Sequence, residues 1–303
     1  MPPHSRLLIL TALLLGLASP AAPQSGRRVE IVDLTGRFLT FYDSATADAA
    51  DPGTRWQLWR RLYNFAAVPP TPFGDSLARR LLDSAWTRYH AALAIIKKGP
   101  AGLGISPDSA LARVLGLLQC GDSVKVRLTV FVGGFEGNAF AFGQREGRSN
   151  IAVPVEAGNP ARSLLHEFTH AVQRAGCAPF RSGYGGTLAE LVVTEGLAMR
   201  VVEAAMPGHD DDFYTAAAPG WLATARARRA AILAGVRASV EDSGAAVWGR
   251  FTFGAGATGL SREAYYAGWE AVGEMLREGM SFHEIATMNP AEYAGVLRRV
   301  IDK

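Results

Sequence analysis

The chain has 303 residues and a formal net charge of +3, and 49% of its residues are hydrophobic. This length suits one large domain or two small ones, and this apolar content supports a substantial core. The small positive charge is no electrostatic footprint for nucleic acid, so the sequence predicts no nucleic-acid partner.

The N-terminus has the features of a secretory signal peptide. His4 and Arg6 precede an apolar run at 7–17, and small residues follow at 18–22. This is the order of regions in a cleavable signal, and the run is too short to span a bilayer. We therefore expect residues 1–22 to be removed. The mature protein should be exported, periplasmic or extracellular, with no membrane span.

The next hundred residues read mainly as helices. Residues 28–42 alternate loosely and fit a strand or a short lead-in, and residues 45–53 read as a loop. Aromatic side chains recur on one side of the predicted helix 54–67, which a proline-rich stretch ends. Two further helices are expected: one capped by Asp75 or Ser76 and reaching Lys98, and one opened by Ser106 and Pro107 and reaching Gln119.

Two strands are expected after these helices. Residues 124–132 alternate polar and apolar types with β-branched residues, which predicts a strand. A glycine-rich, aromatic stretch at 135–147 follows, without the lysine and spacing of a phosphate loop. Residues 150–155 form the second strand, and Pro154 within it indicates an edge strand. An extended peptide could pair with such an edge, and a loop covering it is the alternative.

The predicted helix 161–175 carries His166 and His170. Residues four apart lie on the same face of a helix, so both imidazoles can bind one metal ion. Glu167 is one step round the helix, where it can reach a metal-bound water but is poorly placed as a ligand. This is the H-E-x-x-H pattern of zinc hydrolases, and it predicts Zn²⁺ with Glu167 as the general base.

A catalytic zinc ion usually has three protein ligands, so a third must come from elsewhere. Glu190 and Glu195 both lie on the predicted helix 187–206, about 140° apart round its axis. Glu195 has apolar residues at the i±3 and i±4 positions, where an unpaired carboxylate is costly. We therefore predict Glu195 as the ligand, with Glu190 as the alternative. Gly196 would let this helix approach the His helix closely.

Only two cysteines are present, Cys120 and Cys177. In an oxidising compartment two cysteines can form a disulfide, which would tether the His helix to the segment before the first strand. The unpaired alternative stays open. Residues 178–186 read as a mobile loop near the site. Further helices are expected at about 220–240, 262–278 and 290–301, with a glycine-rich connection at 249–259.

The His pair followed by Thr194-Glu195-Gly196-Leu197-Ala198 resembles the gluzincin arrangement of two histidines and a downstream glutamate. More narrowly, it is similar to the YjaZ-like group of bacterial zinc-dependent proteases. That group has a Tyr/Gly-rich helix further along the chain, and residues 265–269 resemble it. The resemblance covers roughly residue 124 to the C-terminus. It implies a zincin-like fold, supports Glu195 over Glu190, and suggests Tyr265 as the group that stabilises the oxyanion. Tyr266 and Tyr184 are the alternatives.

We expect an α+β, zincin-like fold that is mostly helical, with a small sheet whose edge strand precedes the His helix. Residues 23–303 should form a single metallopeptidase domain, with a helical part at about 54–119 and a catalytic part at about 120–303. The expected function is zinc-dependent hydrolysis of a peptide or protein. The alternatives are an exported zinc-binding protein without turnover and a hydrolase of non-peptide amides. Substrate preference and oligomeric state stay open.

Overall fold

The computed structural model describes residues 28–68, 70–121, 124–156, 158–177 and 186–301. The described strands are β1 (Val29–Asp33), β2 (Val126–Phe131), β3 (Phe140–Arg145) and β4 (Arg148–Pro154). The described helices are α1 (Thr35–Ala47), α2 (Pro52–Leu62), α3 (Pro72–Ile96), the short 3₁₀ helix η1 (Gly99–Leu103), α4 (Pro107–Leu118), α5 (Pro160–Gly176), α6 (Leu188–Ala205), α7 (Asp211–Thr215), α8 (Trp221–Ala227), α9 (Arg229–Ser239), α10 (Ala245–Thr252), α11 (Glu263–Arg277), α12 (Phe282–Thr287) and α13 (Pro290–Ile301).

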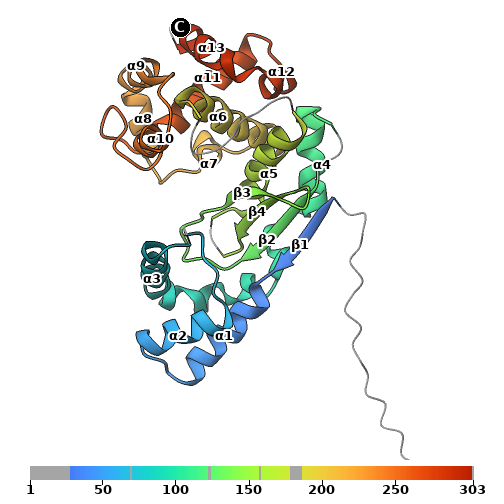
Figure 1. Ribbon diagram of the computed structural model, residues 1–303, viewed down its shortest axis with the longest axis vertical. Coiled ribbons are helices and arrows are strands. Elements are labelled where there is room, and N and C mark those ends of the chain that lie inside the picture. Colours follow the sequence, from blue (N-terminus) through green and yellow to red (C-terminus); the bar gives the residue numbers. More distant parts are fainter. Residues whose placement is uncertain (1–27, 69, 122–123, 157, 178–185, 302–303) are drawn as a thin grey trace, which may run out of the picture.

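The protein is mostly helical with one small mixed sheet, which agrees with the predicted α+β class. The strand order is β1-β2-β4-β3, with β1, β2 and β4 parallel and β3 antiparallel to β4. Figure 1 shows the sheet in the middle of the molecule, α1–α3 at one end and α6–α13 at the other. Helix α5 follows β4 directly in the chain and packs against it.

The prediction that residues 150–155 form an edge strand was wrong, because β4 lies inside the sheet between β2 and β3. Pro154 is the last residue of β4 and lies opposite Phe131 of β2. Strand β3 begins opposite Ala152, so the N–H that Pro154 lacks leaves no gap in the β3–β4 ladder. The next residue, Val155, resumes the pairing by donating its N–H to the Phe131 carbonyl at 2.9 Å.

The edge strand beside β4 is β3, which occupies the stretch expected to be a glycine-rich connection. Arg145 pairs with Arg148, so Glu146 and Gly147 form a two-residue hairpin turn. Both turn residues have positive φ, 56° and 70°, as a type I′ turn requires. The β3–β4 pairing is irregular around Gly143, whose φ is 60°. The glycines therefore shape a strand and its turn.

The N-terminal helices are hydrogen-bonded to the end of β2. The Tyr63 hydroxyl accepts from the Val132 N–H at 2.7 Å and lies 2.8 Å from the carbonyl of the same residue. The Tyr89 hydroxyl donates to the Gly133 carbonyl at 2.8 Å. Both tyrosines are buried, so these bonds fix the helical part to the sheet.

The N-terminal elements differ from the prediction in two places. Helix α1 occupies a segment expected to be a strand or lead-in followed by a loop. Thr71 caps α3 in place of Asp75 or Ser76, because its side chain accepts from the Gly74 N–H. Ser106 caps α4 as predicted.

One disulfide and one close helix–helix contact hold the helices of the C-terminal part together. Cys120 and Cys177 form a disulfide, so the segment after α4 is tied to the end of α5. Gly196 faces Gly268 of α11, where an added Cβ would meet the Gly268 carbonyl. The expected close approach therefore joins α6 to α11, and the prediction that Gly196 faces the His helix was wrong.

The predicted signal peptide, residues 1–22, lies outside the described residues. Within the described residues no helix combines the length and apolar character needed to cross a bilayer. The disulfide is compatible with an exported protein, because paired cysteines persist in oxidising compartments.

Candidate metal site

Helix α5 begins where the sequence predicts. The Asn159 side chain accepts the Arg162 N–H at 2.9 Å, and Pro160 occupies the first helical position. Its apolar side is fully buried and consists of Leu164, Leu165, Phe168, Ala171 and Val172. This packing holds the histidine-bearing side in a fixed orientation.

The structure brings together the three predicted metal ligands. His166 Nε2 lies 3.1 Å from Glu195 Oε2 and 3.1 Å from His170 Nε2, and His170 Nε2 lies 3.5 Å from Glu195 Oε1. Ligand atoms that bind one zinc ion tetrahedrally at about 2.0–2.2 Å are about 3.3–3.6 Å apart. The observed distances of 3.1–3.5 Å lie within or slightly below this range, so these residues could hold a metal ion.

Glu195 enters this cluster from α6, and its apolar neighbours on that helix are buried: Leu191, Val192, Ala198 and Met199. Burial raises the pKa of the Glu195 carboxyl, but the adjacent imidazoles of His170 and His166 outweigh it and hold the pKa well below its usual range. The carboxylate is therefore charged at neutral pH and suited to bind a cation.

Glu190, the alternative ligand, has a different partner. Thr187 caps α6, and the Glu190 side chain accepts the Thr187 N–H at 2.9 Å while the Thr187 hydroxyl accepts the Glu190 N–H at 3.2 Å. This reciprocal pair is a capping box, which satisfies two N–H groups at the helix start. Glu190 thus stabilises the helix that carries Glu195.

Glu167, the predicted general base, is buried with 8% of its surface exposed. Burial raises the pKa of its carboxyl, and the charges of His166 and His170 oppose that rise. Glu167 belongs to the same turn of α5 as His166 and is not one of the clustered ligands.

The three candidate tyrosines differ in their settings. Tyr265 is half-buried near the start of α11, with the Arg262 guanidinium 3.9 Å from the centre of its ring. Tyr266 is fully buried against Trp221, and its hydroxyl has no hydrogen-bond partner among the described residues. Tyr184 lies outside the described residues, as do positions 178–185 of the predicted mobile loop.

Sequence reasoning missed two arginines beside the histidine pair. Arg162, His166, His170 and Arg174 are spaced by four residues along α5, so one arginine precedes the pair by a turn and one follows it by a turn. The arginine spacing was visible in the sequence. What the sequence does not show is that Arg262, immediately before α11, binds the same short helix α7 as Arg162.

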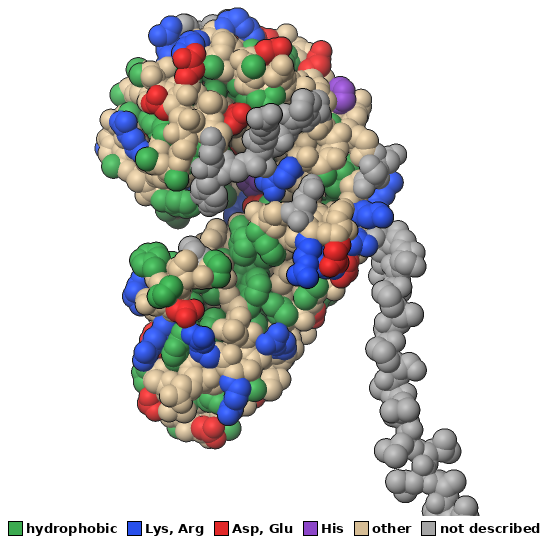
Figure 2. All heavy atoms as spheres, viewed as in Figure 1, with side chains coloured by type: hydrophobic (Ala, Val, Ile, Leu, Met, Phe, Trp, Pro, Cys, Tyr) green, Lys and Arg blue, Asp and Glu red, His purple; other side chains and the backbone are tan. Residues whose placement is uncertain are grey.

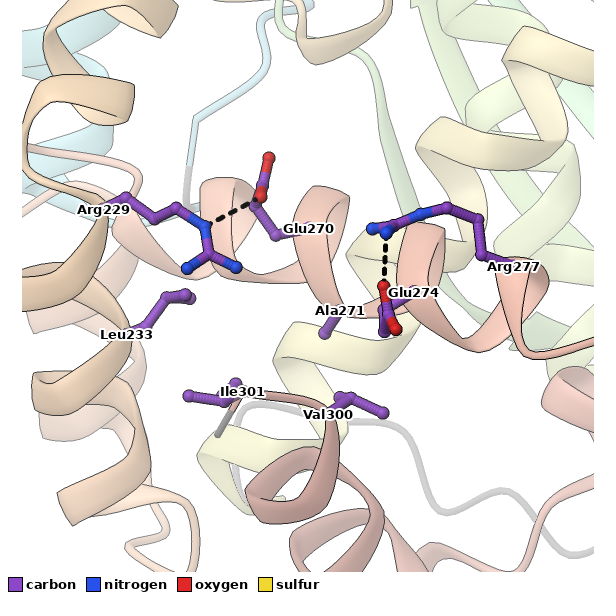
Figure 3. Close-up of a pocket in the computed structure, with 8 residues that line it drawn as sticks. All are labelled: Arg229, Leu233, Glu270, Ala271, Glu274, Arg277, Val300 and Ile301. Carbon is purple, nitrogen blue, oxygen red and sulfur yellow. Dashed lines mark hydrogen bonds and ion pairs between the residues drawn. The ribbon is translucent and has the colours of Figure 1, made fainter. Parts of the chain in front are cut away.

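The surface near the sheet is hollowed. Figure 2 shows a hollow between the end of the molecule that carries α1–α3 and the end that carries α6–α13, with a histidine side chain visible at its inner end. A separate pocket of about 210 Å³ is lined by residues of α9, α11 and α13, where Arg229 pairs with Glu270 and Arg277 with Glu274 (Figure 3). None of the metal-site residues lines this pocket.

Comparison with known proteins found no relative of this chain. No family model, curated protein or solved structure matches the chain.

Proposed function

We propose that this protein is an exported, zinc-dependent peptidase with a zincin-like fold. The observation that carries the proposal is the convergence of His166, His170 and Glu195 at 3.1–3.5 Å, with the buried Glu167 in the same helical turn. Two imidazoles and one carboxylate are the three protein ligands of many catalytic zinc sites, which keep a fourth position for water. A structural zinc site needs no adjacent base.

The chain's own residues have distinct roles in this proposal. His166, His170 and Glu195 would hold the ion, which would supply a water molecule of lowered pKa and polarise the scissile carbonyl. Glu167 accepts the proton of the attacking water and delivers it to the leaving amine. Its raised pKa suits this role, because a carboxylate whose pKa is shifted towards neutral pH is a stronger base for the proton of the attacking water. Tyr265 donates a hydrogen bond to the oxyanion.

The edge strand β3 supports a peptide as substrate. It pairs with β4 on one side, has no strand on its other side among the described residues, and packs against α5. An extended peptide can add to such an edge by main-chain hydrogen bonds, which would lay it alongside the helix that carries His166 and His170. Phe142 on β3 is 42% exposed and offers an apolar contact for a substrate side chain.

A direct test combines metal analysis with hydrolysis of an unfolded protein. The purified mature chain should contain about one zinc ion per molecule and cleave reduced casein. Chelation should abolish cleavage, and stoichiometric zinc should restore it. A protein that keeps zinc and cleaves no peptide would favour the alternative of a zinc-binding protein without turnover. Cleavage of small non-peptide amides alone would favour the other alternative.

A further inference from the structure

Two arginines, one on α5 and one immediately before α11, bind backbone carbonyls of the same short helix. Arg162 is one turn before His166 on α5, and its Nη1 donates to the Phe213 carbonyl at 2.9 Å. Arg262 immediately precedes α11, and its Nη2 donates to the Thr215 carbonyl at 3.0 Å. Both guanidinium groups are thus anchored to the last turn of the same short helix, α7.

Neither guanidinium has an acidic partner in the part of the chain that the structure describes. Among the described residues no carboxylate lies within 4.0 Å of Arg162 or Arg262, whereas buried Arg55 pairs with Asp83 at 3.0 Å. Each arginine is only partly exposed, and the buried Nε of Arg262 has no hydrogen-bond partner among the described residues. Two neighbouring positive charges in such a place are costly unless an anion neutralises them.

The local energetics agree with this geometry. Burial, and then the positive charge of Arg262, lower the pKa of Arg162. Arg262 also has a φ of 65°, a left-handed conformation that is unfavourable for a residue with a side chain. The fold therefore keeps two guanidinium groups at one short helix at a cost in repulsion and in backbone strain, and the Nε of Arg262 is buried without a hydrogen-bond partner among the described residues.

We propose that Arg162 and Arg262 form a carboxylate-binding subsite for the peptide substrate. A guanidinium presents a planar fork of donors that matches a carboxylate, and two of them can bind one carboxylate from two sides. The inference rests on the proposed peptidase function and narrows its substrate class to peptides with a carboxylate near the scissile bond. That carboxylate is either the free C-terminus or an acidic side chain.

Capping of α7 is the competing explanation for the two arginines, because basic side chains commonly bind the last carbonyls of a helix. Capping alone predicts a loss of stability in variants of either residue and no change in the choice among substrates. The measurement therefore has to report substrate choice, and zinc content and thermal melting have to be recorded on the same samples.

The experiment uses four degenerate octapeptide mixtures. The C-termini are free in two mixtures and amidated in the other two, and within each pair one mixture contains Asp and Glu and the other lacks them. Cleavage is followed by mass spectrometry. The zinc-loaded protein should cleave mixtures that keep the relevant carboxylate about 10- to 100-fold faster, the factor that a charge-assisted hydrogen bond provides. Arg162→Gln and Arg262→Gln should lower this ratio towards one, with zinc content unchanged. Arg298→Gln, which removes a surface arginine paired with Glu241, should keep the ratio.

Binding gives a second readout that does not need turnover. Calorimetry on the Glu167→Gln protein with the same mixtures should show the same preference, and again the preference should fall in the two arginine variants. A preference that follows the C-terminus identifies the terminal carboxylate, and one that follows Asp and Glu identifies a side chain. Peptide hydrolysis without any carboxylate preference, or a preference that both arginine variants retain, would overturn the subsite. If the protein neither hydrolyses nor binds any of the mixtures, the peptidase proposal itself is overturned.

Discussion

Glu195 Oε2 lies 3.1 Å from His166 Nε2, although 29 positions separate the two residues in the chain. They come from different helices, so this contact depends on how α5 and α6 pack. The capping box of Thr187 and Glu190 fixes the start of α6. The close approach of Gly196 to Gly268 fixes the position of α6 against α11. The metal cluster is therefore a product of tertiary packing around a local His pair.

The two glutamates of α6 should separate cleanly by mutation. We expect Glu195→Ala to lower zinc affinity at least about 100-fold, because it removes one of three protein ligands. Glu190→Ala should leave zinc affinity unchanged and destabilise the fold by about 0.5–2 kcal/mol through loss of the capping box. Competition with a fluorescent chelator measures the affinity, and urea denaturation measures the stability. Wild-type zinc affinity in Glu195→Ala would refute its assignment as a ligand.

Tyr265 and Tyr266 offer a matched pair for the oxyanion role. Tyr265→Phe should lower kcat about 100-fold with little change in zinc content, since it removes one hydrogen-bond donor to the developing charge. Tyr266→Phe should have no effect on kcat, because the Tyr266 hydroxyl is buried and has no hydrogen-bond partner within the described ranges of the chain. Steady-state kinetics on one peptide compares the two. A kcat for Tyr265→Phe equal to that of the wild type would remove Tyr265 from the mechanism.

Gly196 should be intolerant of a side chain. An added Cβ would collide with the Gly268 carbonyl, so Gly196→Ala should destabilise the protein by about 1–3 kcal/mol as α6 and α11 separate. Gly116→Ala is the control, because Gly116 is exposed within α4 and has open space around it. That change should stabilise the protein by about 0.5–1 kcal/mol. Denaturant unfolding of both variants gives the comparison, and equal effects would contradict the proposed contact.

Glu156 should make stability depend on pH. Burial raises the pKa of its carboxyl from 4.5 to about 7, and its Oε1 accepts the Gly133 N–H at 3.0 Å. The folded state then binds more protons than the unfolded state between about pH 4.5 and 7. The contribution of Glu156 to the free energy of unfolding is fully present below pH 4.5. It is lost as the pH rises through 7, by roughly 3 kcal/mol in total. Urea unfolding across this range measures the slope.

The Glu156→Gln variant is the control for that slope, because its amide keeps an acceptor oxygen and does not ionise. Its stability should change less between pH 4.5 and 7 than that of the wild type. A wild-type slope of the opposite sign, or an equal slope in the variant, would show that Glu156 is not the responsible group.

Local signals in the sequence predicted the elements that carry the site. The His166–His170 spacing, the Asn159-Pro160 start and the apolar side of the helix predicted α5, and the apolar neighbours of Glu195 distinguished it from Glu190. These features depend on residues within two helical turns of one another. The disulfide was left open, since pairing of two cysteines depends on their positions in space.

The errors arose where tertiary context decides. Pro154 suggested an edge strand, but β4 pairs with β3 only up to Ala152, so Pro154 takes no part in that ladder. Strand β3 was not predicted because its segment is rich in glycine. The partner of Gly196 is 72 positions away in Gly268, so nothing local identifies it. Helix α1 is a different case. Its buried residues Phe38, Phe41, Tyr42 and Ala45 have helical spacing, and that signal was available.

The most direct test of the central claim is the Glu167→Gln variant. Zinc content and hydrolysis of reduced casein should be measured on the same samples of wild type and variant. We predict equal zinc content and a loss of about 100- to 10,000-fold in kcat, the contribution of a general base. Full hydrolysis by a zinc-loaded Glu167→Gln protein would contradict the account, as would a wild-type protein that binds no zinc.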